Sequence, residues 1–314
     1  MFFHATLSVK FKMSSGLKTF CLLIGLYKIR MSSNERISSS RCVEKIVLPS
    51  CAPGNQRYLF VHKWGPQNGD SAYIQASLHA DEVPGLLVAN HLIKMIQEID
   101  SLGGITKQII VVPFANPIGL SQSVFERHIG RYCLASSINF NRNWIDLTNR
   151  ITSKVEALLS MDESSNVYEI RKLILSELGL LHSATMKEDD YLKCALLKYA
   201  AIADVALDLH CDSDAILHLY TLDKLWPKLS DLAIELQSRC QLISPATGGN
   251  PFDEVCSGLW SNIAEKFPMY PIPIACQSVT VELRGESDVS AALHAHKFIT
   301  YISYSVNPVV VRDC

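Results

Sequence analysis

Two histidines and a glutamate have the types and spacing that a metal ion requires. His79 and Glu82 follow one apolar run at a three-residue spacing, and His210 ends a second apolar run within Asp208-Leu209-His210. Catalytic zinc takes three protein ligands of nitrogen and oxygen type and keeps a fourth position for water. A His-x-x-Glu pair alone arises by chance, and a lone histidine is more often a buried residue bonded to backbone. The combination of both motifs after apolar runs predicts a metal site.

A carboxylate on a third apolar run could move a proton. Glu282 lies in Thr-Val-Glu-Leu-Arg-Gly. Beside a metal-activated water, a carboxylate can accept the proton of that water and return it to a leaving amine. The alternative interpretation is a strand-end glutamate paired with Arg284. Glu286 and Asp288, on what reads as a loop, are further candidates for the same role.

These residues depend on elements that bring them together. From Arg57 onward, β-type runs alternate with helical stretches, which is typical of an α/β sheet with helices on its faces. In such sheets ligands bind beyond the carboxyl ends of the strands, so residues far apart in sequence can converge. We expect strands at 73–78, 109–114, 205–209 and 279–283, a helix at 84–98, and a mostly helical segment at 151–203 that covers one side of the site.

The composition excludes several functional classes. The chain has 314 residues, 48% hydrophobic and 19% charged, which suits a globular protein with a sizeable core. A net charge of -2 gives no basic face for nucleic acid. The ten cysteines are scattered without a CxxC pair, so we interpret them as reduced and packed, Cys211 included.

The first residues carry no functional assignment. The apolar segment 19–27 is far shorter than the roughly 20 residues of a membrane span. Basic residues precede it as in a signal peptide, but Lys28 and Arg30 follow it where a small-residue cleavage site belongs. We expect a cytoplasmic protein, with secretion as the alternative, and a leader or disordered extension at residues 1–40. Met31 reads as a natural start.

On these motifs the chain resembles the succinylglutamate desuccinylase/aspartoacylase family of the zinc carboxypeptidase superfamily, over about residues 47–301. The family motif Gly-x-His-Gly-Asp-Glu is matched by residues 76–82, with departures at the glycine positions, and its Asp-Leu-His by residues 208–210. The resemblance implies a three-layer αβα domain with a mixed, largely parallel central sheet. It also implies one zinc ion per chain on His79, Glu82 and His210, with Glu282 as general base.

The resemblance implies a substrate clamp as well. The segment 139–144 is similar to the family's Asn-Arg element, in which Asn141 and Arg142 would grip the free carboxylate of an amino acid. Arg131 stands where family members place an arginine that polarises the scissile carbonyl. Arg127 competes for that role.

The implied reaction is hydrolysis of an amide bond, with an N-acyl amino acid or a short peptide as the substrate. A carboxypeptidase, an esterase and an inactive binding protein on the same fold are the alternatives, and another divalent ion could replace zinc. We expect no nucleic-acid or membrane partner, and homo-oligomerisation stays open. The turn at 248–254 either shapes the pocket or punctuates the fold.

The expected domain boundaries follow from the same resemblance. The catalytic domain spans residues 41–302, and residues 303–314 form a C-terminal stub. Family members continue from the catalytic glutamate into a small β-rich domain, whereas only 32 residues follow Glu282. We therefore expect this second domain to be absent or truncated.

Overall fold

The computed structural model describes residues 39–50, 52–67, 69–182, 186–246 and 248–289. The expected leader lies outside the described residues except for its last two positions, and the expected C-terminal stub lies outside them entirely. No helix in the described ranges has the length and hydropathy to cross a bilayer.

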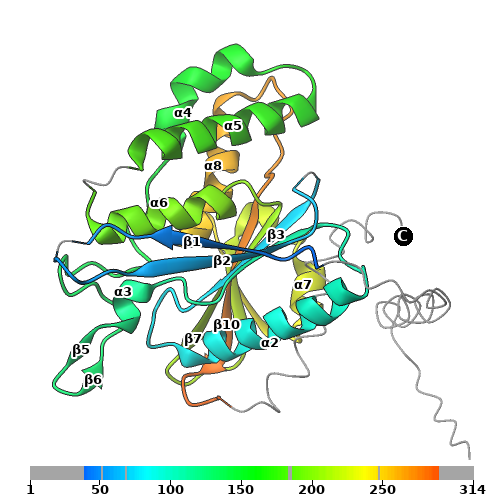
Figure 1. Ribbon diagram of the computed structural model, residues 1–314. Helices are drawn as coiled ribbons and strands as arrows, with labels where there is room; N and C mark the ends of the chain where they lie inside the picture. The colour runs from blue at the N-terminus through cyan, green and yellow to red at the C-terminus, as the bar shows by residue number, and fades with distance from the viewer. Residues whose placement is uncertain (1–38, 51, 68, 183–185, 247, 290–314) are drawn as a thin grey trace, which may run out of the picture. The chain divides into compact units, whose positions relative to one another are not determined.

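A mixed β-sheet forms the centre of the described part (Figure 1). Its strand order is β1-β2-β4-β3-β7-β10-β8-β9. The four central strands β4, β3, β7 and β10 are parallel, so their carboxyl ends lie at one edge of the sheet. The bounds are β1 (Cys42–Val47), β2 (Tyr58–Trp64), β3 (Ser71–Ala76), β4 (Gln108–Val112), β7 (Val205–Asp212), β8 (His218–Leu222), β9 (Cys240–Ser244) and β10 (Gln277–Gly285).

Helices cover both faces of this sheet, which confirms the expected αβα arrangement (Figure 1). One face packs against α2 (Val83–Ser101) and α7 (Ser230–Glu235). The other packs against α4 (Thr148–Val155), α5 (Glu163–Leu181), α6 (Glu188–Ala200) and α8 (Phe252–Lys266). Short elements complete the description: α3 (Pro117–Leu120), the 3₁₀ turns η1 (Glu156–Leu158) and η2 (Asp223–Leu225), and the hairpin of β5 (Ser123–Val124) and β6 (Arg127–His128).

The two faces of the central strands differ in chemistry. In β7, Leu207 and Leu209 belong to the apolar cluster with α2 and α7. Side chains alternate between faces along a strand, so Asp208 and His210 point to the face that α8 covers. The neighbouring strand β10 repeats this alternation. Toward the carboxyl ends of these strands, one face therefore supplies core residues and the other supplies polar groups.

The expected strands and helix are present, but their bounds differ from the expectation by a few residues. Strand β7 continues to Asp212, because His210 aligns with Glu282 of β10 and the pairing extends past the expected end at residue 209. The segment 151–203 is helical as expected but divides into α4, η1, α5 and α6. Asp162 starts α5 by accepting a hydrogen bond from the backbone N–H of Ser165 at 2.8 Å.

Candidate metal centre

A tight turn between β3 and α2 carries the first two candidate ligands. Its backbone lies directly against Gly130. The Ala80 N–H donates to the Gly130 carbonyl at 3.0 Å, and the Gly130 N–H donates to the Asp81 carboxylate at 3.2 Å. These contacts fix the turn, and within it His79 and Glu82 are only 3% and 4% exposed.

Three side chains meet behind this turn. His79 Nδ1 lies 2.8 Å from Glu82 Oε1, and His210 Nδ1 lies 2.9 Å from Glu82 Oε2. Each of the three residues offers one potential ligand atom, and these three atoms all lie within 4.8 Å of one another. Two imidazoles and a carboxylate are a donor set that zinc accepts in catalytic sites. The structure thus brings together the three residues that the sequence selected.

The far nitrogen of each imidazole ring contacts an oxygen. His79 Nε2 lies 2.8 Å from Asn139 Oδ1, and His210 Nε2 lies 2.8 Å from Asp208 Oδ2. An ionised carboxylate only accepts hydrogen bonds, so Nε2 of His210 carries a proton. Because Nε2 of each ring is taken up by its oxygen partner, Nδ1 is the nitrogen that faces Glu82. Oxygen partners of this kind orient the rings of metal-binding histidines.

The charges of this cluster suit a cation. Burial alone would raise the pKa of Glu82, but His210 and His79 lower it well below its ordinary value. Burial alone would lower the pKa of His210, yet Asp208 and Glu82 raise it well above its ordinary value. The His210 ring thus lies between two carboxylates, Glu82 at Nδ1 and Asp208 at Nε2. A divalent cation held by His79, Glu82 and His210 would balance the buried charge of Glu82, while Asp208 keeps its contact with His210 Nε2, so these residues fit a metal ion.

Asp208→Asn is expected to weaken metal binding about 10–100-fold, because it removes the charged partner of His210 Nε2 and keeps the side-chain shape. Competition against a chromogenic chelator measures the affinity. Asp214→Asn, on the exposed loop after β7, is the matched control. Equal affinities in the two variants would contradict a positioning role for Asp208.

A cavity of about 240 Å³ opens beside the cluster. Glu82 is buried behind it and does not line it. The other residues of the preferred assignment all line this cavity, namely His79, His210, Glu282, Arg131, Asn141 and Arg142, whereas the alternatives Arg127, Glu286 and Asp288 do not.

Glu282 is the carboxylate on the strand next to His210, at the same register position. Its Oε2 atom is buried and has no hydrogen-bond partner among the described residues. Burial raises the pKa of Glu282, and the charge of Glu82 adds to this effect while that of His210 opposes it. The alternative interpretation paired Glu282 with Arg284. In the structure Arg284 forms its ion pair with Asp288, at 3.1 Å.

Asn141 and Arg142 reach the cavity from a loop that is tied to α8. Asn141 Oδ1 accepts hydrogen bonds from Trp144 Nε1 at 3.2 Å and from the Phe252 backbone N–H at 2.9 Å. The amide N–H groups of Asn141 are then what it can offer to a bound molecule. Arg142 Nη1 donates to the Asn141 carbonyl at 2.8 Å. Amide and guanidinium donors side by side can bind a carboxylate.

The structure separates the two competing arginines. Arg131 lines the cavity, and its Nη1 lies 3.2 Å from Glu82 Oε1 with the side chain half exposed. Arg127 lies in β6 of the exposed two-stranded hairpin and does not line the cavity. Of the two, Arg131 alone is placed to act on a molecule bound there.

Sequence reasoning missed part of the cavity lining. Thr280, Tyr220 and Asp253 also line it. The signal for Thr280 was available, since it stands two residues before Glu282 and strand alternation puts both on one face. Asp253 belongs to the segment 248–254, which was interpreted as a turn that either shapes the pocket or interrupts the fold; in the structure its last three residues form the start of α8.

The buried carboxyl group of Asp253 should make the stability of the folded protein depend on pH. Burial, with the charges of Glu254 and Asp208, raises its pKa from 3.8 to about 7. Between these values the folded protein binds a proton that the unfolded chain has lost, so stability falls as pH rises. Asp253→Asn cannot ionise, and we expect it to raise the Tm of metal-free protein at about pH 8 and to raise it less at about pH 4.5. Thermal melts of both proteins at the two pH values measure this; a gain that is independent of pH would contradict it.

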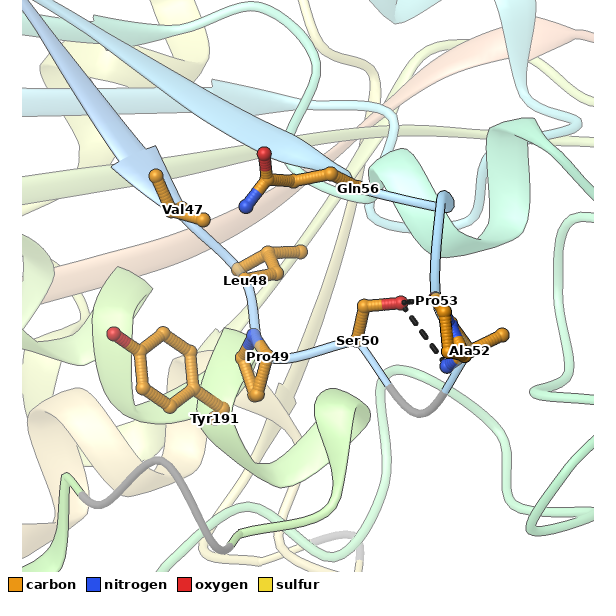
Figure 2. A pocket seen from close by; sticks show the side chains of 8 residues that line it. All are labelled: Val47, Leu48, Pro49, Ser50, Ala52, Pro53, Gln56 and Tyr191. Atoms are coloured by element: carbon orange, nitrogen blue, oxygen red, sulfur yellow. Dashed lines mark hydrogen bonds between the residues drawn. The ribbon is translucent and has the colours of Figure 1, made fainter.

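A second and larger hollow, of about 620 Å³, lies between the end of β1 and α6 (Figure 2). Pro49 and Pro53 are part of its wall, and the Ser50 hydroxyl donates to the Ala52 carbonyl at 3.0 Å. Tyr191 is the one titratable side chain among the eight residues that line it. Metal or acid–base chemistry therefore belongs to the smaller cavity.

Comparison with known proteins links this site to one family. The family model of the succinylglutamate desuccinylase/aspartoacylase catalytic domain matches residues 68–238, more than half of the chain. The matched segment includes His79, Glu82 and His210, and it ends before Glu282. A search of curated proteins found no match.

Solved structures share the fold. A succinylglutamate desuccinylase/aspartoacylase family protein from Shewanella amazonensis aligns with a TM-score of 0.71 and 23% identity, over 84% of this chain and 71% of that one. A succinylglutamate desuccinylase from Silicibacter aligns with a TM-score of 0.54 and 14% identity, over 88% and 68%. The product-bound ectoine utilization protein EutE (DoeB) from Ruegeria pomeroyi aligns with a TM-score of 0.54 and 13% identity, over 87% and 69%.

Proposed function

Since the chain belongs to the succinylglutamate desuccinylase/aspartoacylase family of hydrolases, we propose that it is a zinc-dependent amidohydrolase that cleaves N-acyl amino acids. One observation carries the proposal. Three metal-ligand donors meet within 4.8 Å, beside a carboxylate oxygen that has no partner among the described residues, at a cavity with an Asn-Arg pair. The small volume of the cavity, about 240 Å³, favours a substrate of amino-acid size over a long peptide.

His79, Glu82 and His210 would hold the zinc ion. The low pKa of Glu82 keeps it a charged ligand throughout the physiological pH range. When bound, zinc supplies polarisation of a carbonyl oxygen and lowers the pKa of a water molecule.

Glu282 moves the proton in this mechanism. It accepts a proton from the water as the water oxygen bonds to the substrate carbonyl carbon. It then delivers that proton to the amide nitrogen as the carbon–nitrogen bond breaks. The products are a carboxylic acid and a free amine.

The remaining residues orient the substrate and balance its charge. Arg131 lies at the cavity next to Glu82 and stabilises negative charge that develops on the carbonyl oxygen. Arg142 and the N–H groups of Asn141 bind the free carboxylate of the amino-acid half.

A substrate panel with zinc analysis tests the proposal. Zinc-loaded protein is assayed on N-acyl amino acids, short peptides with a free carboxyl terminus, and matched esters. Zinc binding together with hydrolysis of the N-acyl amino acids supports the proposal. A strong preference for peptides would indicate a carboxypeptidase, and a preference for esters would indicate an esterase. Zinc-loaded protein without hydrolysis would contradict the proposal and favour a binding protein.

Arg142→Ala is expected to raise KM about 10–100-fold on N-acyl amino acids, because a charge-assisted hydrogen bond to the substrate carboxylate is lost. Steady-state kinetics on the free acid and on the matched amino-acid carboxamide measure the effect. The carboxamide lacks the charge, so its kinetics should change less. Arg127→Ala, on the hairpin outside the cavity, is the control variant. An equal loss on both substrates would contradict the clamp.

A further inference from the structure

The cavity extends below Glu282 to a second polar row of the sheet. His210 aligns with Glu282 across the strands, and two residues earlier Asp208 aligns with Thr280, which in turn aligns with Tyr220. Side chains two residues apart on a strand point the same way and lie about 6.6 Å apart. Thr280 and Tyr220 both line the cavity. The cavity therefore has a floor one strand repeat below the proposed reacting groups.

The three floor residues are an acid and two hydroxyl-bearing side chains, and the two basic residues of the cavity, Arg131 and Arg142, belong to the carbonyl and carboxylate sites described above. Asp253, in the first turn of α8, lines the same cavity and is only 8% exposed. The ion pairs found among the described residues do not include it. The charges of Glu254 and Asp208, both acidic, act on it, and its carboxylate accepts hydrogen bonds from its own backbone N–H and from that of Glu254. Thr280 Oγ1 is buried without a hydrogen-bond partner among the described residues. A bound group with positive charge would satisfy these side chains.

The proposed carboxylate clamp would put the amino-acid half of a substrate next to this floor. Asp253 directly follows Phe252, whose backbone N–H donates to Asn141 Oδ1 at 2.9 Å. Asn141 is part of the proposed carboxylate clamp, so the side chain of an amino acid held there lies close to Asp253. The acyl half contains the reacting carbonyl and lies on the other side of the scissile carbon–nitrogen bond.

We propose that Asp253, with Thr280 and Tyr220, forms a subsite that selects substrates whose amino-acid half carries a second, positively charged amino group. This inference rests on the proposed function and names its substrate class. An ammonium group has three N–H donors and a full positive charge, which complements a buried carboxylate and a hydroxyl. An apolar side chain would leave Asp253 uncompensated, and an acidic one would add a like charge.

Competing substrates of matched length test the subsite. We compare Nα-acetylornithine and Nα-acetyllysine with Nα-acetylnorvaline, Nα-acetylnorleucine and Nα-acetylglutamate. Wild-type protein should favour each diamino acid over its apolar match by about 10-fold or more in kcat/KM, and Asp253→Asn should lose most of that ratio. Glu265→Gln, at the far end of α8, should keep the wild-type ratio. No preference in the wild type, or equal losses on every substrate in Asp253→Asn, would overturn the subsite.

Binding of the free product separates this inference from the proposed function. Calorimetry with ornithine should show binding to the wild type that is about 10-fold weaker in Asp253→Asn. If no N-acyl amino acid is hydrolysed but this difference in binding is found, the proposed function fails and the subsite stands. If hydrolysis is found but ornithine binds both proteins alike or binds neither, the subsite is wrong.

Discussion

Glutamine in place of Glu282 is expected to lower kcat about 10²–10⁴-fold while the protein still binds zinc. Glutamine keeps the shape of the side chain but cannot accept the proton of a water molecule. Glu282 is not one of the three clustered donors, and its Oε2 has no partner among the described residues, so the substitution should cost the fold little. Steady-state kinetics together with elemental analysis of bound zinc measure both parts of this result.

Glu286→Gln is the matched control for this experiment. Glu286 is exposed on the loop after β10 and contacts the hydroxyl of Ser213 at 3.4 Å. Its loss should leave kcat near the wild-type value. Full activity in Glu282→Gln, or a comparable loss in Glu286→Gln, would show that the base is assigned to the wrong carboxylate.

Gly130→Ala is expected to lower kcat/KM by at least about 10²-fold in a protein that still folds. A Cβ atom at Gly130 would lie 2.1 Å from the Asp81 nitrogen and 2.6 Å from the Ala80 carbonyl carbon. Both are backbone atoms, so the turn that carries His79 and Glu82 has to move. A shift of about 1 Å in groups that position the reaction is enough for such a loss. Kinetics, chelator competition and a circular dichroism spectrum test the effect.

Gly179→Ala distinguishes this clash from a general effect of losing a glycine. Gly179 lies in α5, and among the described residues a Cβ there would meet no atom within 4 Å outside the adjacent backbone of its own helix. Alanine favours a helix over glycine by roughly 0.5–1 kcal/mol, so this variant should melt no earlier than the wild type and keep its activity. Unchanged activity in Gly130→Ala would mean that the turn can shift without moving its ligands.

Local sequence signals were sufficient for the central strands and the ligand turn. A β-type run before His79 and a proline after Glu82 predicted a strand, a turn and a helix, and the structure has β3, the turn and α2 in that order. Boundaries moved by a few residues, because pairing with neighbouring strands decides where a strand ends. The roles assigned to Glu282 and Arg131 and the domain boundaries stay predictions.

Contacts between distant segments were beyond sequence reasoning. The bond between Asn139 and His79 joins residues 60 positions apart, and no local pattern marks it. Asp253 reaches the cavity because the Phe252 N–H binds Asn141, a contact across 111 positions. Such pairings depend on how the helices settle on the sheet, which the periodicity of a single segment does not encode. Which residues would lie together was therefore easier to predict than the shape of the pocket that they line.

The alternation along β10 has a consequence for how this protein can change over evolutionary time. Val279 and Val281 are packed in the core, whereas Thr280 and Glu282 border the cavity. Substitution of Val279 or Val281 by another apolar residue changes the stability of the fold and has little influence on ligand binding. Exchanges at Thr280 alter the floor of the cavity without opening a void in the core beneath. New substrate preferences can thus arise on one side of a strand while the other side continues to keep the chain folded.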